Sequence, residues 1–203
     1  MIARHAEPTL LQLAEGYPVV VVTGPRQSGK TTLVRKLFPD RPYVSLEDLD
    51  VRAFATDDPR GFLGQYPDGA VLDEAQRCPT LFPYLQTRVD ADGRSGLFIL
   101  SGSQQFNLLS GISQSLAGRA ALFTLLPFSL PELAATDLAP KRMADLLFKG
   151  LYPPIYDRKL DPSIWYGNYT ATYIERDVRQ LVNVRDLSAF QVFIRMCAGR
   201  TGQ

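Results

Sequence analysis

One short stretch of the chain combines the residue types needed to hold a phosphate group. Residues 24–32 read GPRQSGKTT and fit the pattern G-x-x-x-x-G-K-[ST] of a phosphate-binding loop. Its two glycines let the backbone turn tightly and approach an anion without an intervening Cβ atom. The backbone N–H groups of such a loop, and of a helix that starts there, point toward phosphate oxygens. The stretch therefore predicts a nucleotide-binding site.

The side chains of this loop have separate expected roles. Lys30 should reach the β- and γ-phosphates, and the Thr31 hydroxyl should ligate Mg²⁺. Thr32 could donate one more hydrogen bond to a phosphate. The residues expected to contact the nucleotide are Gly24, Pro25, Arg26, Gln27, Ser28, Gly29, Lys30, Thr31 and Thr32. The competing interpretation is a glycine-rich turn that fits the pattern by coincidence.

Two regular elements should position the loop. Residues 17–23 contain four consecutive valines, a composition typical of a strand buried on both faces. Residues 31–38 place apolar side chains four positions apart, as in a helix that faces a sheet. Pro39 should end that helix, because proline cannot continue it. A strand before and a helix after are the context that a phosphate-binding loop requires.

A second chemical motif ends an apolar strand pattern that begins at Ala70. In P-loop enzymes an aspartate at such a strand end holds Mg²⁺, and Asp73 is the expected metal-holding residue here. Glu74 is the expected group that polarises the attacking water during hydrolysis of the γ-phosphate. The alternative is a strand that simply ends in two solvated acids.

Polar residues also follow the buried strand pattern of residues 97–100. Ligands of open parallel sheets sit at the carboxyl ends of the strands. Ser101, Ser103 or Gln104 could therefore sense the γ-phosphate or place the water. Each of them could equally be a loop residue that caps the next helix.

Arg119 lies just before a fifth strand pattern at residues 120–126. An arginine there could face the γ-phosphate of a neighbouring subunit and act as an arginine finger, which is worth ~10³–10⁵ in rate. The alternative is an ordinary surface ion pair. Arg4 or His5 near the N-terminus could touch the base of a bound nucleotide, but both are expected to face solvent, because arginine is mostly exposed.

The remaining elements give an α/β core followed by helices. Expected elements include a helix over 9–15, a second strand over 43–46, helical turns at 106–109 and 113–116, a rigid turn at 151–154, and helices over 161–182 and 186–198. The charged run at 175–179 could hold a second finger or form a solvated face. A small-residue linker at 134–140 suggests two parts, a core over 1–135 and a helical segment over 136–203.

Composition excludes several functional classes. The chain has 203 residues, 45% of them hydrophobic, and a net charge of +1, so bulk charge does not indicate a nucleic-acid or membrane partner. A single histidine excludes multi-histidine metal sites, and two cysteines without metal-ligand spacing favour a reducing compartment. With no membrane-length apolar run and no leader pattern, the expected location is cytoplasmic.

The motifs taken together resemble one family, the predicted prokaryotic ATPases of the AAA+ superfamily that carry an uncharacterised C-terminal domain. The motifs that carry the resemblance are residues 24–32, 71–76 (VLDEAQ), 100–104 (LSGSQ), 115–119 (SLAGR) and 173–178 (YIERDV). The resemblance covers nearly the whole chain. The phosphate loop alone is not specific to the family, but the set in this order is.

The resemblance implies a P-loop NTPase core with a five-stranded parallel sheet in the order 5-1-4-3-2. It implies ATP and Mg²⁺ as cofactors, Lys30, Thr31, Asp73 and Glu74 in the roles given above, and Ser103 or its neighbours as a sensor. Arg119 matches the Gly-Arg of the family. Members usually continue well past the point where this chain stops, so the chain is expected to be a truncated product, a fragment or a short member. A possible protein or DNA partner would act through the missing region.

The leading functional hypothesis is Mg²⁺-dependent ATP hydrolysis by a switch or motor that binds ATP and ADP and could form a homo-oligomer. A nucleotide-gated interaction module with little intrinsic hydrolysis is the first alternative. A P-loop kinase is the second, but Glu74 beside Asp73 favours water as the phosphoryl acceptor, and no arginine-rich lid is evident.

Overall fold

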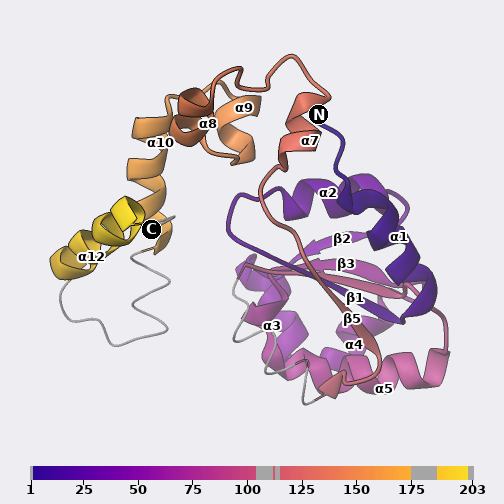
Figure 1. Cartoon of the computed structure of the whole chain (residues 1–203). Coiled ribbons are helices and arrows are strands. Elements are labelled where there is room, and N and C mark those ends of the chain that lie inside the picture. Colours follow the sequence, from indigo (N-terminus) through magenta and orange to yellow (C-terminus); the bar gives the residue numbers. More distant parts are fainter. Residues whose placement is uncertain (1, 104–111, 113–114, 175–186, 201–203) are drawn as a thin grey trace. The chain divides into compact units, whose positions relative to one another are not determined.

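The computed structural model describes residues 2–103, 112, 115–174 and 187–200 (Figure 1). The chain divides into two compact units, residues 1–158 and residues 159–203. The first unit contains the sheet and the second is helical. The boundary expected after residue 135 stays a prediction.

A five-stranded parallel sheet forms the centre of the first unit. Its strands are β1 (Val19–Thr23), β2 (Tyr43–Ser45), β3 (Ala70–Asp73), β4 (Phe98–Ser101) and β5 (Ala120–Thr124). Their order across the sheet is β2-β3-β4-β1-β5, and all four neighbouring pairs are parallel. Read from the other edge, this is the order 5-1-4-3-2, so the expected sheet is confirmed. Because parallel strands need long crossovers, helices lie between most of them.

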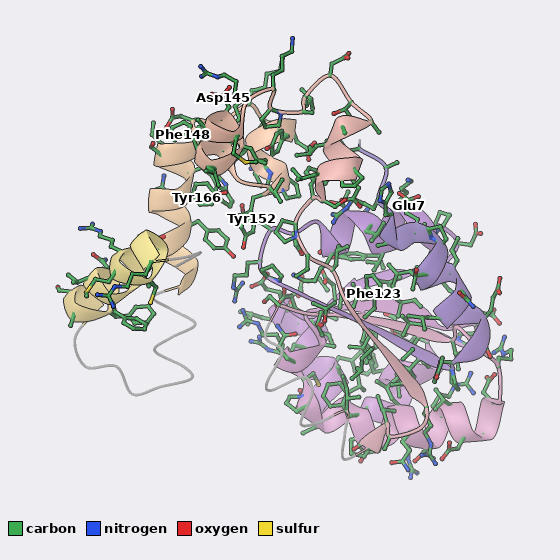
Figure 2. The ribbon with its side chains drawn as sticks, viewed as in Figure 1. Glu7, Phe123, Asp145, Phe148, Tyr152 and Tyr166 are labelled. Carbon is green, nitrogen blue, oxygen red and sulfur yellow. The ribbon has the colours of Figure 1, made fainter. Side chains whose placement is uncertain are left out.

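Helices cover both faces of the sheet (Figure 1). On one face, α1 (Ala6–Gly16) and α2 (Lys30–Leu37) pack over an apolar cluster that includes Leu10, Leu33 and the β1 side chains of Val20 and Val22. Glu7 of α1, labelled in Figure 2, accepts hydrogen bonds of 2.6 and 2.7 Å from Lys36 of α2. This ion pair joins the two helices on the face that supports the phosphate loop.

The opposite face carries α3 (Leu49–Asp57), α4 (Pro59–Gly64) and α5 (Phe82–Asp92), with two short 3₁₀ turns, η1 (Ala75–Arg77) and η2 (Pro79–Leu81), before α5. The Asp48 carboxylate accepts hydrogen bonds from the N–H groups of the first turn of α3. Asp58 does the same for α4, and Gly93 ends α5 in a left-handed conformation. The larger apolar cluster of the core lies under these helices.

Three short helices follow the sheet within the first unit: α7 (Leu130–Ala134), α8 (Met143–Lys149) and α9 (Pro153–Asp157). The rigid turn expected at 151–154 is partly wrong, because Pro153 and Pro154 begin α9, where their missing N–H groups cost nothing. Phe148 of α8, labelled in Figure 2, is 57% exposed, and no residue of α8 is buried.

The second unit begins with α10 (Pro162–Tyr169), capped by the Asp161 carboxylate. The helix expected over 161–182 is helical as far as the structure describes it, because α10 passes after Tyr169 into a π-helical turn, η3 (Thr170–Ile174). Residues 175–182 lie outside the described residues. The Thr172 hydroxyl donates to the carbonyl oxygen of Asn168, a competing bond that disturbs a helix. The final helix, α12, spans Leu187–Arg200.

Several expected features lie outside the described residues. They are the charged run at 175–179, the helical turn at 106–109, and much of the turn at 113–116. No helix in the part of the chain that the structure describes is long and apolar enough to cross a membrane.

Candidate phosphate-binding site

The phosphate loop joins β1, an interior strand of the sheet, to α2 at the carboxyl end of the sheet. Val19 to Val22 are fully buried, which confirms the expected strand. Gly24 has a φ of +137°, and a Cβ atom there would lie 2.2 Å from the carbonyl oxygen of Leu125. Gly29 has a φ of +96° and stands just before the first residue of α2. Both glycines are therefore required by the shape of the loop.

Lys30 is folded onto this loop. Its side chain is buried, and its Nζ donates to the carbonyl oxygens of Gly24 at 3.0 Å and Pro25 at 2.8 Å. Burial lowers the pKa of Lys30 to about 8, with a further lowering from Arg26, although Glu74 and Asp73 act in the opposite direction. An anion bound in the loop would offer the ammonium group a stronger partner than two neutral carbonyls.

Asp73 at the end of β3 accepts hydrogen bonds from three hydroxyl groups. Thr31 donates to its Oδ2 at 3.0 Å, Tyr43 donates to the same oxygen at 2.6 Å, and Ser101 donates to Oδ1 at 2.5 Å. Burial and the bond to Asp73 raise the pKa of Tyr43, so the phenol keeps its proton and acts as the donor. Thr31 and Asp73, distant in sequence, thus lie side by side as expected.

The oxygen atoms of Thr31 and Asp73 fit a magnesium ion. Mg²⁺ is usually held by one or two protein oxygens together with substrate phosphates and water, rather than by a cage of protein ligands. Within the described residues there is no group of three His, Cys, Asp or Glu side chains that could hold a metal by itself. The Thr31 hydroxyl and the Asp73 carboxylate would hold the ion beside the phosphate loop.

Glu74 follows Asp73 in a left-handed backbone conformation, with φ 55° and ψ 42°. Such a conformation costs a non-glycine residue of order 1 kcal/mol or more, and it is typical of functional sites. Its Oε2 accepts a hydrogen bond of 2.5 Å from Nε2 of Gln76, a side chain that is only 8% exposed. The backbone therefore turns at Glu74, and Gln76 fixes where the carboxylate points.

The three sensor candidates at the end of β4 and just after it differ in their contacts. Ser101 is fully buried and lies opposite Asp73 in the strand register, so it contacts that carboxylate directly. Ser103 Oγ is buried and has no hydrogen-bond partner among the described residues. Gln104 lies outside the described residues. The sensor role of Ser103 stays a prediction.

Arg119 lies at the amino end of β5, whereas the phosphate loop follows the carboxyl end of β1. Ala120 is the partner of Val19 in the register of β5 and β1, so Arg119 is level with the start of β1. The five residues of β1 separate it from the loop by roughly 16 Å at the usual rise per residue. Its guanidinium makes a two-pronged ion pair with Asp90 of α5, with distances of 2.5 and 2.8 Å. Arg119 therefore cannot serve the site of its own chain.

Three residues for which the sequence indicated no role in the site, one of them expected in solvent, contact it. They are Tyr43 and Gln76, described above, and Arg4. The expectation that Arg4 faces solvent is wrong, because its side chain is 9% exposed and donates to the carbonyl oxygen of Ser28 in the phosphate loop. His5 is exposed as expected. No local pattern signals the contacts of Tyr43 and Arg4, because they depend on how distant segments pack, whereas Gln76 lies two residues from its partner Glu74.

The chain has relatives among known proteins. Relatives include the uncharacterized proteins Rv2008c of Mycobacterium tuberculosis and Mb2031c of Mycobacterium bovis, each 34% identical over 181 residues and 88% of this chain. The chain spans 40% of the length of these relatives. Residues 140–203 match a domain of unknown function (DUF8612).

Solved structures show the same fold at low sequence identity. The Walker-type ATPase PABY2304 of Pyrococcus abyssi has a TM-score of 0.56 at 14% identity, with coverage of 99% of this chain and 77% of that chain. AMPPCP-bound DnaA of Aquifex aeolicus has a TM-score of 0.51 at 17% identity, with coverage of 85% and 63%. Residues 16–134, more than half of the chain, match the family model of an AAA domain. The chain therefore belongs to the AAA domain family, and its fold is that of a P-loop NTPase.

Proposed function

We propose that this protein binds and hydrolyses ATP with Mg²⁺ and uses the cycle as a switch or motor. The observation that carries the proposal is the convergence of Lys30, Thr31 and Asp73 at the carboxyl end of the sheet. Ligands of open parallel sheets bind at this edge. The DnaA structure with the same fold holds AMPPCP, which supports a nucleotide polyphosphate as the ligand.

Each residue would act on the phosphate chain in a defined way. Lys30 would leave the carbonyls of Gly24 and Pro25 and place its charge on the β- and γ-phosphates. The amides of the loop would meet the negative charge that develops on the transferring phosphoryl group. Thr31 and Asp73 would orient Mg²⁺, which supplies charge neutralisation between the phosphates.

Glu74 would accept the proton of the attacking water. Its carboxylate lies directly after the metal-holding Asp73, and the hydrogen bond from Gln76 restricts its orientation. A general base must be held within hydrogen-bond reach of the proton it takes. Water as the acceptor makes hydrolysis, rather than phosphoryl transfer to a second substrate, the preferred reaction.

Arg119 would act only between subunits. Arg119 lies at the amino ends of the strands, and the phosphate loop lies at their carboxyl ends. A role as an arginine finger therefore requires a second copy of the chain. Its pair with Asp90 would have to open when the neighbouring γ-phosphate approaches. This requirement makes a homo-oligomer the form in which turnover is fast.

The second candidate function is a nucleotide-gated interaction module with little hydrolysis of its own. The observation that favours it is the same ion pair, since an Arg119 held by Asp90 leaves the site without a finger in the single chain. The chain spans 40% of its relatives, and a protein or DNA partner acting through the remainder stays a proposal, as does a cytoplasmic location.

ATP turnover across a protein concentration series, with Mg²⁺ and with EDTA, tests the proposal. We expect turnover per subunit to rise with concentration and to vanish in EDTA. The matched control is Lys30→Ala, which should lose nucleotide binding. Tight Mg·ATP binding without turnover at any concentration would instead establish the gated module, and retained micromolar binding by Lys30→Ala would contradict both.

A further inference from the structure

Arg4 uses every nitrogen of its guanidinium group to join three segments of the first unit. NH1 donates to the Ser28 carbonyl at 2.9 Å, and NH2 donates to the carbonyls of Leu126 at 2.7 Å and Pro127 at 3.2 Å. Nε donates to Oε1 of Glu132 at 3.1 Å. The group therefore lies between the phosphate loop, the exit of β5 and α7.

The bond to Ser28 fixes the orientation of one peptide group. In a trans peptide, the C=O of one residue and the N–H of the next point in opposite directions. No cis peptide bond occurs among the described residues. When Arg4 holds the Ser28 carbonyl, the N–H of Gly29 therefore points to the other side, away from Arg4. Gly29 is the residue that leads into α2, so this amide belongs to the anion-binding set of the loop.

Arg4 itself is held rigidly by its other partners. Burial alone would raise the pKa of Glu132, but N–H groups of Ser129 and His5 and the Arg4 guanidinium outweigh burial and hold the pKa below its usual value. The carboxylate is therefore charged at neutral pH and 5% of the residue is exposed. The guanidinium also lies 5.0 Å from the ring centre of Phe128.

We infer that Arg4 is a positioning residue for nucleotide binding, and that Glu132 transmits the position of α7 to the phosphate loop through it. Arg4 sets the Ser28–Gly29 peptide so that the Gly29 amide faces the phosphate, and the charged bond from the guanidinium polarises that amide further. Arg4 makes no contact with the nucleotide, because its nitrogens are already used. This inference rests on the proposed nucleotide site.

Comparing ATP with ADP separates positioning from direct contact. We expect Arg4→Ala to weaken ATP and ADP binding by the same factor, about tenfold, because the orientation of one charged hydrogen bond is lost. Lysine would not replace Arg4, because a single ammonium group lacks the planar fork with which the guanidinium reaches both the loop and Glu132. The matched control is Arg94→Ala, which removes an exposed arginine paired with Asp68 and Asp92.

A loss confined to ATP would overturn the inference, because it would mean that Arg4 touches the γ-phosphate. Unchanged affinity for both nucleotides would overturn it as well. Glu132→Gln keeps the shape of the side chain but removes its charge. It should weaken the binding of both nucleotides, by a smaller factor than Arg4→Ala, and it provides the test if Arg4→Ala fails to fold.

Hydrogen exchange of the nucleotide-free protein gives a readout that needs no ligand. Amides of residues 24–31 should exchange faster in Arg4→Ala than in the wild type, whereas those of β4 should not change. If the wild-type chain binds no nucleotide, the proposed function fails, and this exchange difference still decides whether Arg4 orders the loop. Equal exchange in both proteins would reject the positioning role.

Discussion

The buried ammonium group of Lys30 gives the nucleotide affinity a defined dependence on pH. Burial lowers the pKa of Lys30 to about 8 from the ordinary 10.5. A polyphosphate binds the charged form and not the neutral one. Below pH 8 the lysine carries its charge before the ligand arrives, and above pH 8 a growing fraction of the protein must first take up a proton. Affinity should therefore be nearly constant up to pH 8 and fall above it.

The size of the effect follows from the fraction of charged lysine. With a pKa of about 8, roughly one molecule in eleven carries the charge at pH 9, so the apparent Kd should rise about tenfold between pH 7 and pH 9. The ligand contributes little over this range, because the last phosphate ionisation lies near pH 6. The sign for stability is opposite: between pH 8 and 10.5 the unfolded chain binds the proton that folded Lys30 lacks, so this group makes the free energy of unfolding rise with pH.

Calorimetric titration of Mg·ADP at pH 7, 8 and 9 in buffers of different ionisation enthalpy measures both the affinity and the proton uptake. Lys30→Arg is the matched control, because a guanidinium stays charged throughout and should bind with a flat pH profile. A wild-type Kd that is the same at pH 7 and pH 9, with no proton uptake, would refute the reasoning. It would mean that Lys30 is charged in the empty loop despite its burial.

Four further changes test other parts of the site. Glu74→Gln should bind Mg·ATP normally and stop turnover, whereas undiminished phosphate release would remove Glu74 from the mechanism. Arg119→Ala should leave binding unchanged and reduce turnover at high protein concentration by ~10³-fold; an unchanged rate would exclude a finger supplied by a neighbour. Tyr43→Phe should raise the half-saturating Mg²⁺ concentration about tenfold, as for other residues that orient metal ligands, and Tyr66→Phe, which alters a tyrosine packed against Phe62 of α4, should not. Gly24→Ala should lower the free energy of unfolding by ~3 kcal/mol or abolish folding, because of its positive φ and the nearby carbonyl, and urea denaturation would show no change if the loop can relax.

The sequence was sufficient for the elements that carry the loop. Four valines before residue 24 and spaced apolar residues after Lys30 predict the strand and helix that the structure contains. The sheet order required the family resemblance, because no pattern within single strands says which strand lies beside β1. The pairing of Thr31 with Asp73 followed from the two motifs together.

Contacts across strands and between distant segments could not be predicted. Tyr43 reaches Asp73 only because β2 and β3 pair with Ser45 opposite Asp73, and a shift of register would move its phenol away. Arg4 was expected in solvent because arginine usually is, but the Glu132 carboxylate and three backbone carbonyl oxygens stabilise its burial. The π-helical turn within the helix expected after Asp161 could not be predicted, because apolar spacing does not reveal the side-chain bond of Thr172.

The place of each strand in the sheet also decides how easily the phosphate loop, and the support of Asp73 by Tyr43, open by local unfolding. The phosphate loop follows β1, which pairs on both sides and has no exposed residue from Val19 to Val22. Tyr43 belongs to β2, a three-residue strand at the edge of the sheet. Edge segments open at lower free energy than central ones. The hydrogen bond from Tyr43 to Asp73 should therefore be lost in partial openings that leave the phosphate loop folded. Mild destabilisation should then weaken the binding of Mg²⁺ before it weakens the binding of the nucleotide.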